Sequence, residues 1–352
     1  MTSDNKHSGG KYGGGIISLI IAAFFLYLAF RNVDLEKAFS ILENVSFFWL
    51  LVFIAIFLLT NFVRALRWKV ILRNVKRDAS LLNLFAAMMI GYGVNSVVPR
   101  LGEIYRAFFL GKWEGLSRTS MFGTVIIERL IDILALFFSV FVSVLIYSGD
   151  IYTRISWLKA TLITGGIISG AFLFGIIMIV LSGEKSYSLV IKFVAKFSPR
   201  FSEKLREFFA SLVEGFASVK GTKTVVGIAV LTALIMLLYG LNSYVGFYLL
   251  GLQNSYDVSY STAWILMTIS AFGIVIPTPG GIGSYHAIVI FVLTALFGFS
   301  SDESAAYAIL THFISYFGFI FLAVVFLFLA NKRQQKLGFS KQNFWSVLKR
   351  EN

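Results

Sequence analysis

Charged and histidine side chains occur at only a few positions inside long apolar stretches, and chemistry is expected at these positions. The sequence is 57% hydrophobic and 14% charged, whereas soluble domains carry about 25% charged residues. Each ionisable side chain in a membrane segment costs about 2.5–3.5 kcal/mol on insertion scales and is a functional candidate by default. The candidates are Arg100, Glu103, Arg106, Glu128, Arg129, Asp132, His286 and His312.

The first group surrounds Pro99, which interrupts the apolar region 81–113. A broken helix leaves backbone groups without partners, and membranes tolerate them only inside protein or beside a wet cavity. We expect a second short helix to start near Gly102, where Glu103 suits the helix N-terminus. Arg106 shares a face with Glu103 and can either pair with it or bind a lipid phosphate with its two-pronged guanidinium. The substrate-binding candidates here are Asn95, Pro99, Arg100, Gly102, Glu103 and Arg106.

The second group surrounds a Pro- and Gly-rich interruption of region 260–298. Glycines allow close backbone approach and positive φ angles. Amides at the start of the helix after Gly283 can cradle an anion, and a tight turn without a ligand is the plainer alternative. The candidates are Pro279, Gly280, Gly281, Gly283, Ser284, Tyr285 and His286, with His312 from the next span.

The two histidines are expected to face one another across the site. They lie on antiparallel segments joined by the short stretch 299–303. Aligning Pro99 with Pro279 puts His286 opposite Arg106. A protonated histidine there would serve the same anion and make activity depend on pH.

Glu128, Arg129 and Asp132 form a third group within one span. Their spacing places both acids on one face and Arg129 within reach of Asp132. Two acids and one base leave a negative charge, for which Arg100 or Arg106 is the natural partner. We expect a supporting charge network behind the site.

Six segments qualify as full membrane spans of about 20 mostly apolar residues. Regions 81–113 and 260–298 are expected to be re-entrant hairpins, each returning to its own side. With this arrangement most of the 31 basic residues fall on the cytoplasmic side, in 1–15, 64–77, 112–118, 183–223 and 331–352, as the positive-inside rule requires. The spans are roughly 13–31, 47–66, 119–147, 157–182, 224–250 and 304–330.

The fold expected is therefore all-α: a polytopic protein of the cytoplasmic (inner) membrane with both termini cytoplasmic. The order of span, broken hairpin and span occurs twice with opposite orientation, which predicts an inverted-topology repeat with a site at the broken helices. The parts are a tail 1–12, a transmembrane domain 13–330 with an amphipathic cytoplasmic segment 183–223, and a basic tail 331–352.

Composition excludes several classes of function. Cysteine is absent and the three histidines are far apart, so neither a disulfide framework nor a metal site is expected. No cofactor motif is present. The net charge of +13 fits contact with anionic lipid headgroups rather than nucleic acid. No signal-peptide cleavage motif follows the first apolar run.

Three ordered motifs resemble the lysylphosphatidylglycerol synthase transmembrane-region family, flippase-like proteins also called UPF0104 membrane proteins. The resemblance covers about 13–330 and implies a membrane unit that translocates lipids. A fused soluble synthase is not expected, because the polar remainder is short, and lysyltransferase activity is therefore not expected either. The family usually has an acid at the position of His286 and often an Arg at that of His312, so this chain departs there. The motif residues are Pro99, Gly102, Glu103 and Arg106, then Glu128, Arg129 and Asp132, then Pro279, Gly280, Gly281, Ile282 and Gly283.

A lipid flippase or transporter is the function expected. Its partner would be a membrane lipid: an anionic or aminoacylated phospholipid, a hopanoid or a polyprenyl-linked lipid. The sequence leaves open a homo-oligomer. The alternatives are a membrane-embedded transferase acting on a lipid-linked substrate, an intramembrane serine protease using Ser284 and His312, and a non-transporting scaffold. The protease is disfavoured because Tyr285 follows Ser284 where a Gly is usual, and the scaffold because embedded charges are costly.

Overall fold

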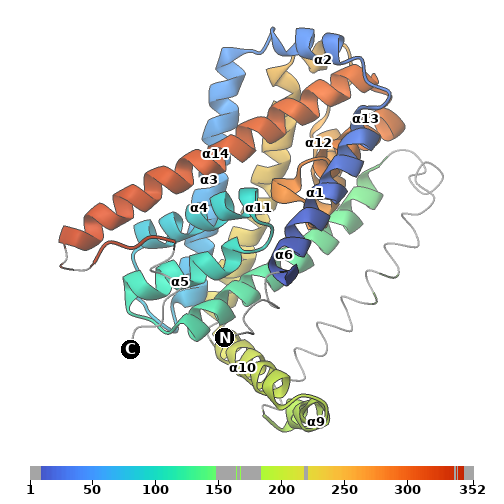
Figure 1. Ribbon diagram of the computed structural model, residues 1–352. Helices are drawn as coiled ribbons and strands as arrows, with labels where there is room; N and C mark the ends of the chain where they lie inside the picture. Colours follow the sequence, from blue (N-terminus) through green and yellow to red (C-terminus); the bar gives the residue numbers. More distant parts are fainter. Residues whose placement is uncertain are drawn as a thin grey trace, which may run out of the picture.

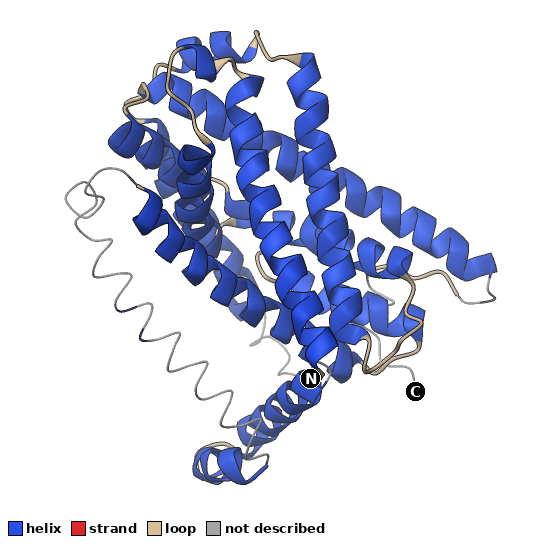
Figure 2. Cartoon of the chain, turned by 180° about the vertical axis from the view of Figure 1, so that it is seen from behind, coloured by secondary structure: helices blue, strands red, loops and turns tan. Residues whose placement is uncertain are grey.

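The described chain consists of helices and connecting loops, without a strand (Figure 2). The computed structural model describes residues 9–147, 164, 167, 184–217, 221–336, 338 and 340–344. The predicted all-α class is confirmed. The helices are α1 (Gly9–Phe30), α2 (Leu35–Leu42), α3 (Phe47–Leu72), α4 (Leu81–Val97), α5 (Gly102–Glu114), α6 (Arg118–Ile146), α9 (Glu184–Ala195), α10 (Pro199–Ala217), α11 (Thr222–Leu249), η1 (Leu252–Asn254), α12 (Tyr260–Val275), η2 (Pro279–Gly281), α13 (Ser284–Phe297) and α14 (Ser301–Lys336).

Five described helices are long and apolar enough to cross a membrane, or six if α1 and α2, which are bent by 88°, count as one span. Segment Pro279–Phe297 is one of the five, but half of its apolar window is buried inside the protein, against 11–28% in the others. It is thus an interior element. Five of the six predicted spans correspond to α1, α3, α6, α11 and α14. The sixth, 157–182, lies outside the described residues except for positions 164 and 167.

Two boundaries differ from the prediction. Helix α3 continues to Leu72 instead of ending at residue 66. Its last turns, which the charge count placed in a cytoplasmic loop, are helical and carry the buried side chains of Arg64 and Arg67. Helix α14 runs to Lys336, so the first residues of the predicted tail 331–352 belong to it. The last turns of α3 have ionic partners inside the protein, and Arg333 of α14 donates to Ser80 and Asn83. These polar contacts let both helices extend beyond their apolar runs.

Helices α3 and α11 form the centre and run in opposite directions (Figure 1). The backbone N–H of Ser46, just before α3, donates to the carbonyl of Leu249, the last residue of α11. The surrounding contacts come in pairs. Helix α4 packs against α5 and α14, and α12 packs against α13 and α6. Likewise α5 contacts α6 as α13 contacts α14. Each broken helix pair, α4 with α5 and α12 with α13, therefore lies between the same two long helices, α6 and α14.

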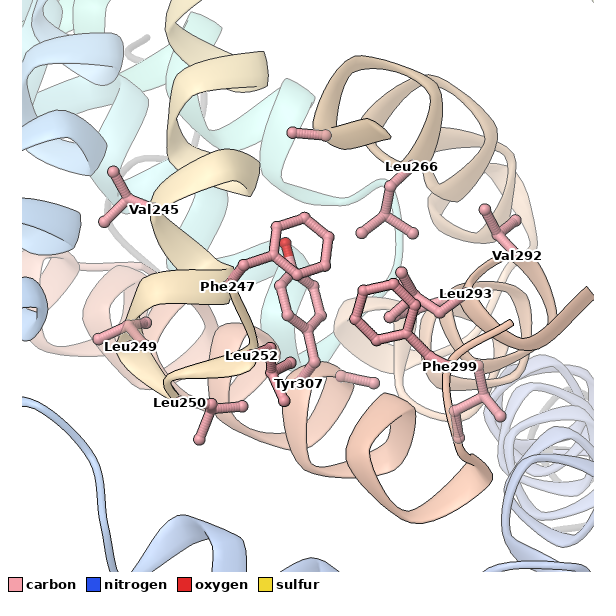
Figure 3. Packing of buried hydrophobic residues seen from close by; sticks show 14 of the residues in the cluster. Val245, Phe247, Leu249, Leu250, Leu252, Leu266, Val292, Leu293, Phe299 and Tyr307 are labelled. Atoms are coloured by element: carbon pink, nitrogen blue, oxygen red, sulfur yellow. The ribbon is translucent and has the colours of Figure 1, made fainter. Parts of the chain in front are cut away.

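Two apolar clusters hold the broken pairs in place. One joins α4, α5, α3 and α6 around buried residues such as Trp68, Met88 and Phe109. The other joins α11, α12, α13 and α14. Figure 3 shows its centre, where Phe247 faces Tyr307 at 4.8 Å between ring centroids. These clusters supply the rigid walls against which the helix breaks are positioned.

The polar segments gather toward one end of the molecule, opposite α2 (Figure 1). Helices α9 and α10 form the expected amphipathic pair, with Phe193, Phe197 and Phe201 exposed, and α10 packs on α6. The chain after α14 folds back at the same end. There the side chain of Asn331 donates to the carbonyl of Gln342 at 2.7 Å and accepts from its N–H at 2.9 Å.

Candidate functional site

The first break is closed by Asn95. Its Oδ1 accepts from the N–H of Gly102, the first residue of α5, at 2.7 Å, and its Nδ2 donates to Glu103 at 3.1 Å. A Cβ at Gly102 would lie 1.9 Å from the carbonyl oxygen of Gly91, so α4 and α5 touch at glycine. Arg100, with φ of 64°, turns the chain between them. The predicted helix start near Gly102 is confirmed.

The second break is closed by hydroxyl groups. Ser284 Oγ donates to the carbonyl of Gly273 at 2.7 Å and lies 2.9 Å from Thr278 Oγ1, which ties the start of α13 to α12. From α1, Ser18 donates to the carbonyl of Pro277 at 2.6 Å. Gly283 has a φ of 83° and lies against α1 so closely that a Cβ would approach the Ala22 oxygen to 2.5 Å. These contacts of Ser284 are those of the tight-turn alternative.

The two breaks meet at one place in the protein. Tyr316 on α14 donates to the carbonyl of Ser96, near the end of α4, at 3.0 Å. The same ring lies against Gly280, where a Cβ would be 2.5 Å from the ring and 3.3 Å from Ser96 Cα. His312 Nε2 donates to the Gly280 carbonyl at 2.9 Å. The two helix breaks, which are far apart in the sequence, thus lie together in one polar region among apolar helices.

His286 and His312 lie together as expected, with ring centroids 4.7 Å apart. Tyr285 stacks on His312 at 5.3 Å, and Phe30 of α1 covers His286 at 5.8 Å. The Nδ1 atom of His286 accepts from the Gly283 N–H at 3.4 Å. A doubly protonated ring cannot accept a hydrogen bond. This geometry is that of a neutral imidazole, unlike the protonated His286 expected beside an anion.

The third group is larger than the sequence indicated. Arg106 pairs with Glu128 at 2.6 Å, and not with Glu103, so that alternative is replaced by a link from α5 to α6. Arg129 reaches Glu128 at 3.1 Å and Asp132 at 3.0 Å. Of the two arginines considered as partners, Arg106 occupies the network, whereas Arg100 lies exposed at the break.

Two further arginines, Arg64 and Arg67 of α3, complete the network. Arg64 binds Asp132 at 2.9 Å and Glu128 at 3.2 Å. Arg67 binds Glu128 at 3.4 Å and also pairs with Asp132. Sequence reasoning missed them because they follow directly on the apolar run. Their spacing of three residues, with apolar neighbours continuing beyond them, is the signal that the helix stays buried.

Neighbouring side chains surround these charges. The Arg64 guanidinium lies over the Tyr92 ring at 5.2 Å from its centroid and donates to the Tyr239 hydroxyl. The Arg106 guanidinium lies over Trp68 at 5.2 Å. Trp68 in turn donates to Thr124 at 3.0 Å. Within the described part of the chain, no three His, Asp or Glu side chains come together as metal ligands.

The fold and site define an all-helical polytopic membrane protein with two broken helix pairs and an embedded charge network. The chain belongs to the family described as the lysylphosphatidylglycerol synthase TM region, whose model matches residues 15–324. The predicted resemblance is confirmed.

Named relatives agree with this membership. A UPF0104 membrane protein of Methanocaldococcus jannaschii is 26% identical over 85% of this chain and 90% of its own length. A UPF0104 membrane protein of Methanothermobacter thermautotrophicus is 27% identical over 87% of this chain and 92% of its own length. The glycosyltransferase AglD of Haloferax volcanii is 24% identical over 84% of this chain but only 51% of its own length. No solved structure matches.

Proposed function

We propose that this protein moves a lipid or lipid-linked molecule between the two leaflets of a membrane. The observation that carries the proposal is the meeting of the two helix breaks, joined by the hydrogen bond from Tyr316 to Ser96. Broken helices at the interface of two repeats form the substrate site of many transporters. A helix break leaves backbone carbonyls and amides without intrahelical partners. Inside a membrane such groups need polar partners, which apolar side chains cannot supply.

The paired helix contacts support an inverted-topology repeat. Helices α3 to α6 form one unit and α11 to α14 the other, and α3 and α11 are antiparallel neighbours. A two-fold axis between them would exchange the contact of α4 with α14 for that of α12 with α6. Alternating exposure of a shared site by rocking of two units is the mechanism such repeats permit.

In the proposed orientation the protein lies in the cytoplasmic (inner) membrane, with both termini in the cytoplasm. The basic amphipathic helices α9 and α10 would then meet the anionic cytoplasmic leaflet, which attracts lysine and arginine. The embedded arginines lie nearer that side. Arg64 is about 12 Å from the end of α3 at 1.5 Å per residue.

Transport is tested by reconstituting the full chain into vesicles of phosphatidylethanolamine and phosphatidylglycerol that contain a trace of fluorescent phospholipid. A membrane-impermeant quencher bleaches only outer-leaflet lipid. We expect proteoliposomes to lose nearly all fluorescence, whereas protein-free vesicles should lose about half. The assay is repeated with a fluorescent polyprenyl phosphate. Equal bleaching of proteoliposomes and empty vesicles with both lipids would refute transport.

A transferase acting on a lipid-linked substrate is the second candidate, because the chain resembles part of AglD. The match covers about half of that protein, so the glycosyltransferase activity in its name need not reside in the shared half. Incubating the purified chain with a sugar nucleotide and a polyprenyl phosphate decides between the two. Formation of a glycosylated lipid without leaflet exchange would favour the transferase.

A further inference from the structure

The embedded charge network has more positive than negative groups. Within the described part of the chain, its ion pairs bring four guanidinium groups to two carboxylates, those of Glu128 and Asp132. The arginines are Arg64, Arg67, Arg106 and Arg129, here called the arginine cluster. Arginine stays protonated in proteins, and both carboxylates are held among several guanidiniums. The cluster with its two acids therefore carries an excess of two positive charges.

Such an excess is costly at this depth. The side chains of Arg67 and Arg106 are 0% and 1% exposed, and that of Glu128 is 0% exposed. Buried charges are normally paired one for one, since an uncompensated ion loses its hydration without return. The neutral neighbours Tyr92, Tyr239 and Trp68 soften the charge but do not cancel it.

Donor atoms of the cluster are also left over. Among the described residues, Arg106 has no hydrogen-bond partner for Nε or Nη2. The Nε atoms of Arg64, Arg67 and Arg129 are equally without one. Buried guanidinium N–H groups rarely lack an acceptor, because each unsatisfied donor costs free energy. Several N–H donors without partners, together with an excess of positive charge, are the features expected of an anion-binding site.

The cluster is partly exposed through two side chains of α6. The side chain of Glu128 is 0% exposed, whereas that of Asp132 is 20% exposed and that of Arg129 is 33% exposed. An anion would approach past Arg129 and meet Arg106 behind it. Arginine forks match the oxygen spacing of phosphate and bind it with two parallel hydrogen bonds.

We propose that the arginine cluster binds a phosphate group, carried by a lipid headgroup or present as free phosphate. The lipid source rests on the proposed function, and phosphate binding itself does not. The group would supply the missing negative charge and accept from Arg106. This makes the network part of the substrate site, whereas the sequence suggested only a support behind it.

The test measures the thermal unfolding midpoint of the purified full chain in a neutral, phosphate-free detergent. Sodium phosphate is compared with sodium chloride at equal ionic strength, and short-chain phosphatidic acid with short-chain diacylglycerol. A ligand that binds only the folded state raises the midpoint as its concentration rises. We expect both phosphate compounds to raise it and neither control to do so.

Two test variants and one control variant localise the effect. Arg106→Gln should weaken the response to phosphate roughly tenfold or more, because a charge-assisted pair of hydrogen bonds is lost. Arg73→Gln, an exposed arginine at the end of the same α3, should respond as the wild type does. Thr232 lies 3.2 Å from Arg67 Nη1. Thr232→Asp should therefore supply an internal counter-charge, raise the midpoint without phosphate and reduce the response to it.

The outcomes separate the two proposals. A wild-type midpoint that ignores both phosphate compounds overturns the anion site, whatever the vesicle assay shows, and so does an unchanged response in Thr232→Asp. Thr232→Asp decides even if Arg106→Gln does not fold. A response to phosphate without one to phosphatidic acid retains the anion site and overturns the lipid source. A response to both with no leaflet exchange refutes transport alone.

Discussion

The hydroxyl of Tyr316 donates to the carbonyl of Ser96 at 3.0 Å across a sequence separation of 220 residues. Ser96 lies in the last turn of α4, where the helix leaves its carbonyls without intrahelical partners. Tyr316 comes from α14, whose neighbouring side chain His312 holds the other break. One face of α14 therefore contacts both breaks, so a movement of one break relative to the other would disturb at least one of these two hydrogen bonds.

Replacing Tyr316 with Phe removes this bond and little else. We expect the free energy of unfolding to fall by about 1 kcal/mol, the usual net contribution of one hydrogen bond, and leaflet exchange to change by more than the stability loss explains. Unfolding in detergent and the vesicle assay are measured side by side. Tyr27→Phe, on a ring that is 66% exposed, is the matched control. Equal behaviour of the two variants would show that the link between the breaks is idle.

Gly102 is expected to tolerate no side chain. A Cβ there would lie 1.9 Å from the Gly91 carbonyl oxygen, and backbone cannot yield as a flexible side chain does. Gly102→Ala should therefore destabilise the protein by about 3 kcal/mol, at the upper end for overpacking. Gly15→Ala, where nothing lies within 4 Å, should be neutral or stabilising by up to about 1 kcal/mol. Fluorescence size-exclusion chromatography after heating compares the temperatures at which the variants unfold. If Gly102→Ala stays folded up to the same temperature as the wild type, the close crossing of α4 and α5 is contradicted.

His312 acts through a single donor in this structure. Its Nε2 donates to the Gly280 carbonyl at 2.9 Å and so holds the second break against α14. His312→Leu leaves that carbonyl unpaired and should cost about 1–3 kcal/mol, together with loss of leaflet exchange. His312→Gln keeps a donor and should retain a larger part of both. If Gln and Leu variants are equally impaired in the vesicle assay while both stay folded, the imidazole itself is required, and the positioning role is insufficient.

The sequence predicted the elements that depend on local chemistry. Pro99 and the glycines around Pro279 interrupt apolar runs, and the structure breaks its helices there. The pairing of His286 with His312 also followed, because a short connection forces adjacent antiparallel segments. Both results rest on residues close to one another along the chain.

Interactions between distant segments could not be predicted in the same way. Arg64 and Arg67 read as loop charges, because a charge after an apolar run normally marks the membrane edge. Only the packing of α3 against α6 shows that the carboxylates of Asp132 and Glu128 lie beside these two arginines. The role of Asn95 was similarly open. The sequence suggests a binding residue, and in the structure the side chain caps α5 through the Gly102 N–H.

The broken pair α4 and α5 is expected to return to the side from which it enters. Its two outer ends are held together, since Asn83 near the start of α4 donates to Glu114 at the end of α5 at 2.6 Å. Helix α2 lies at the opposite end of the molecule (Figure 1). The chain has no cysteine, so single cysteines placed at Leu82, Leu116 and Phe39 report their own positions. An impermeant thiol reagent applied to intact cells and to inverted vesicles should label Leu82→Cys and Leu116→Cys from the same side and Phe39→Cys from the other. Labelling of the first two from opposite sides would mean that α4 and α5 cross the membrane, and the re-entrant arrangement would be wrong.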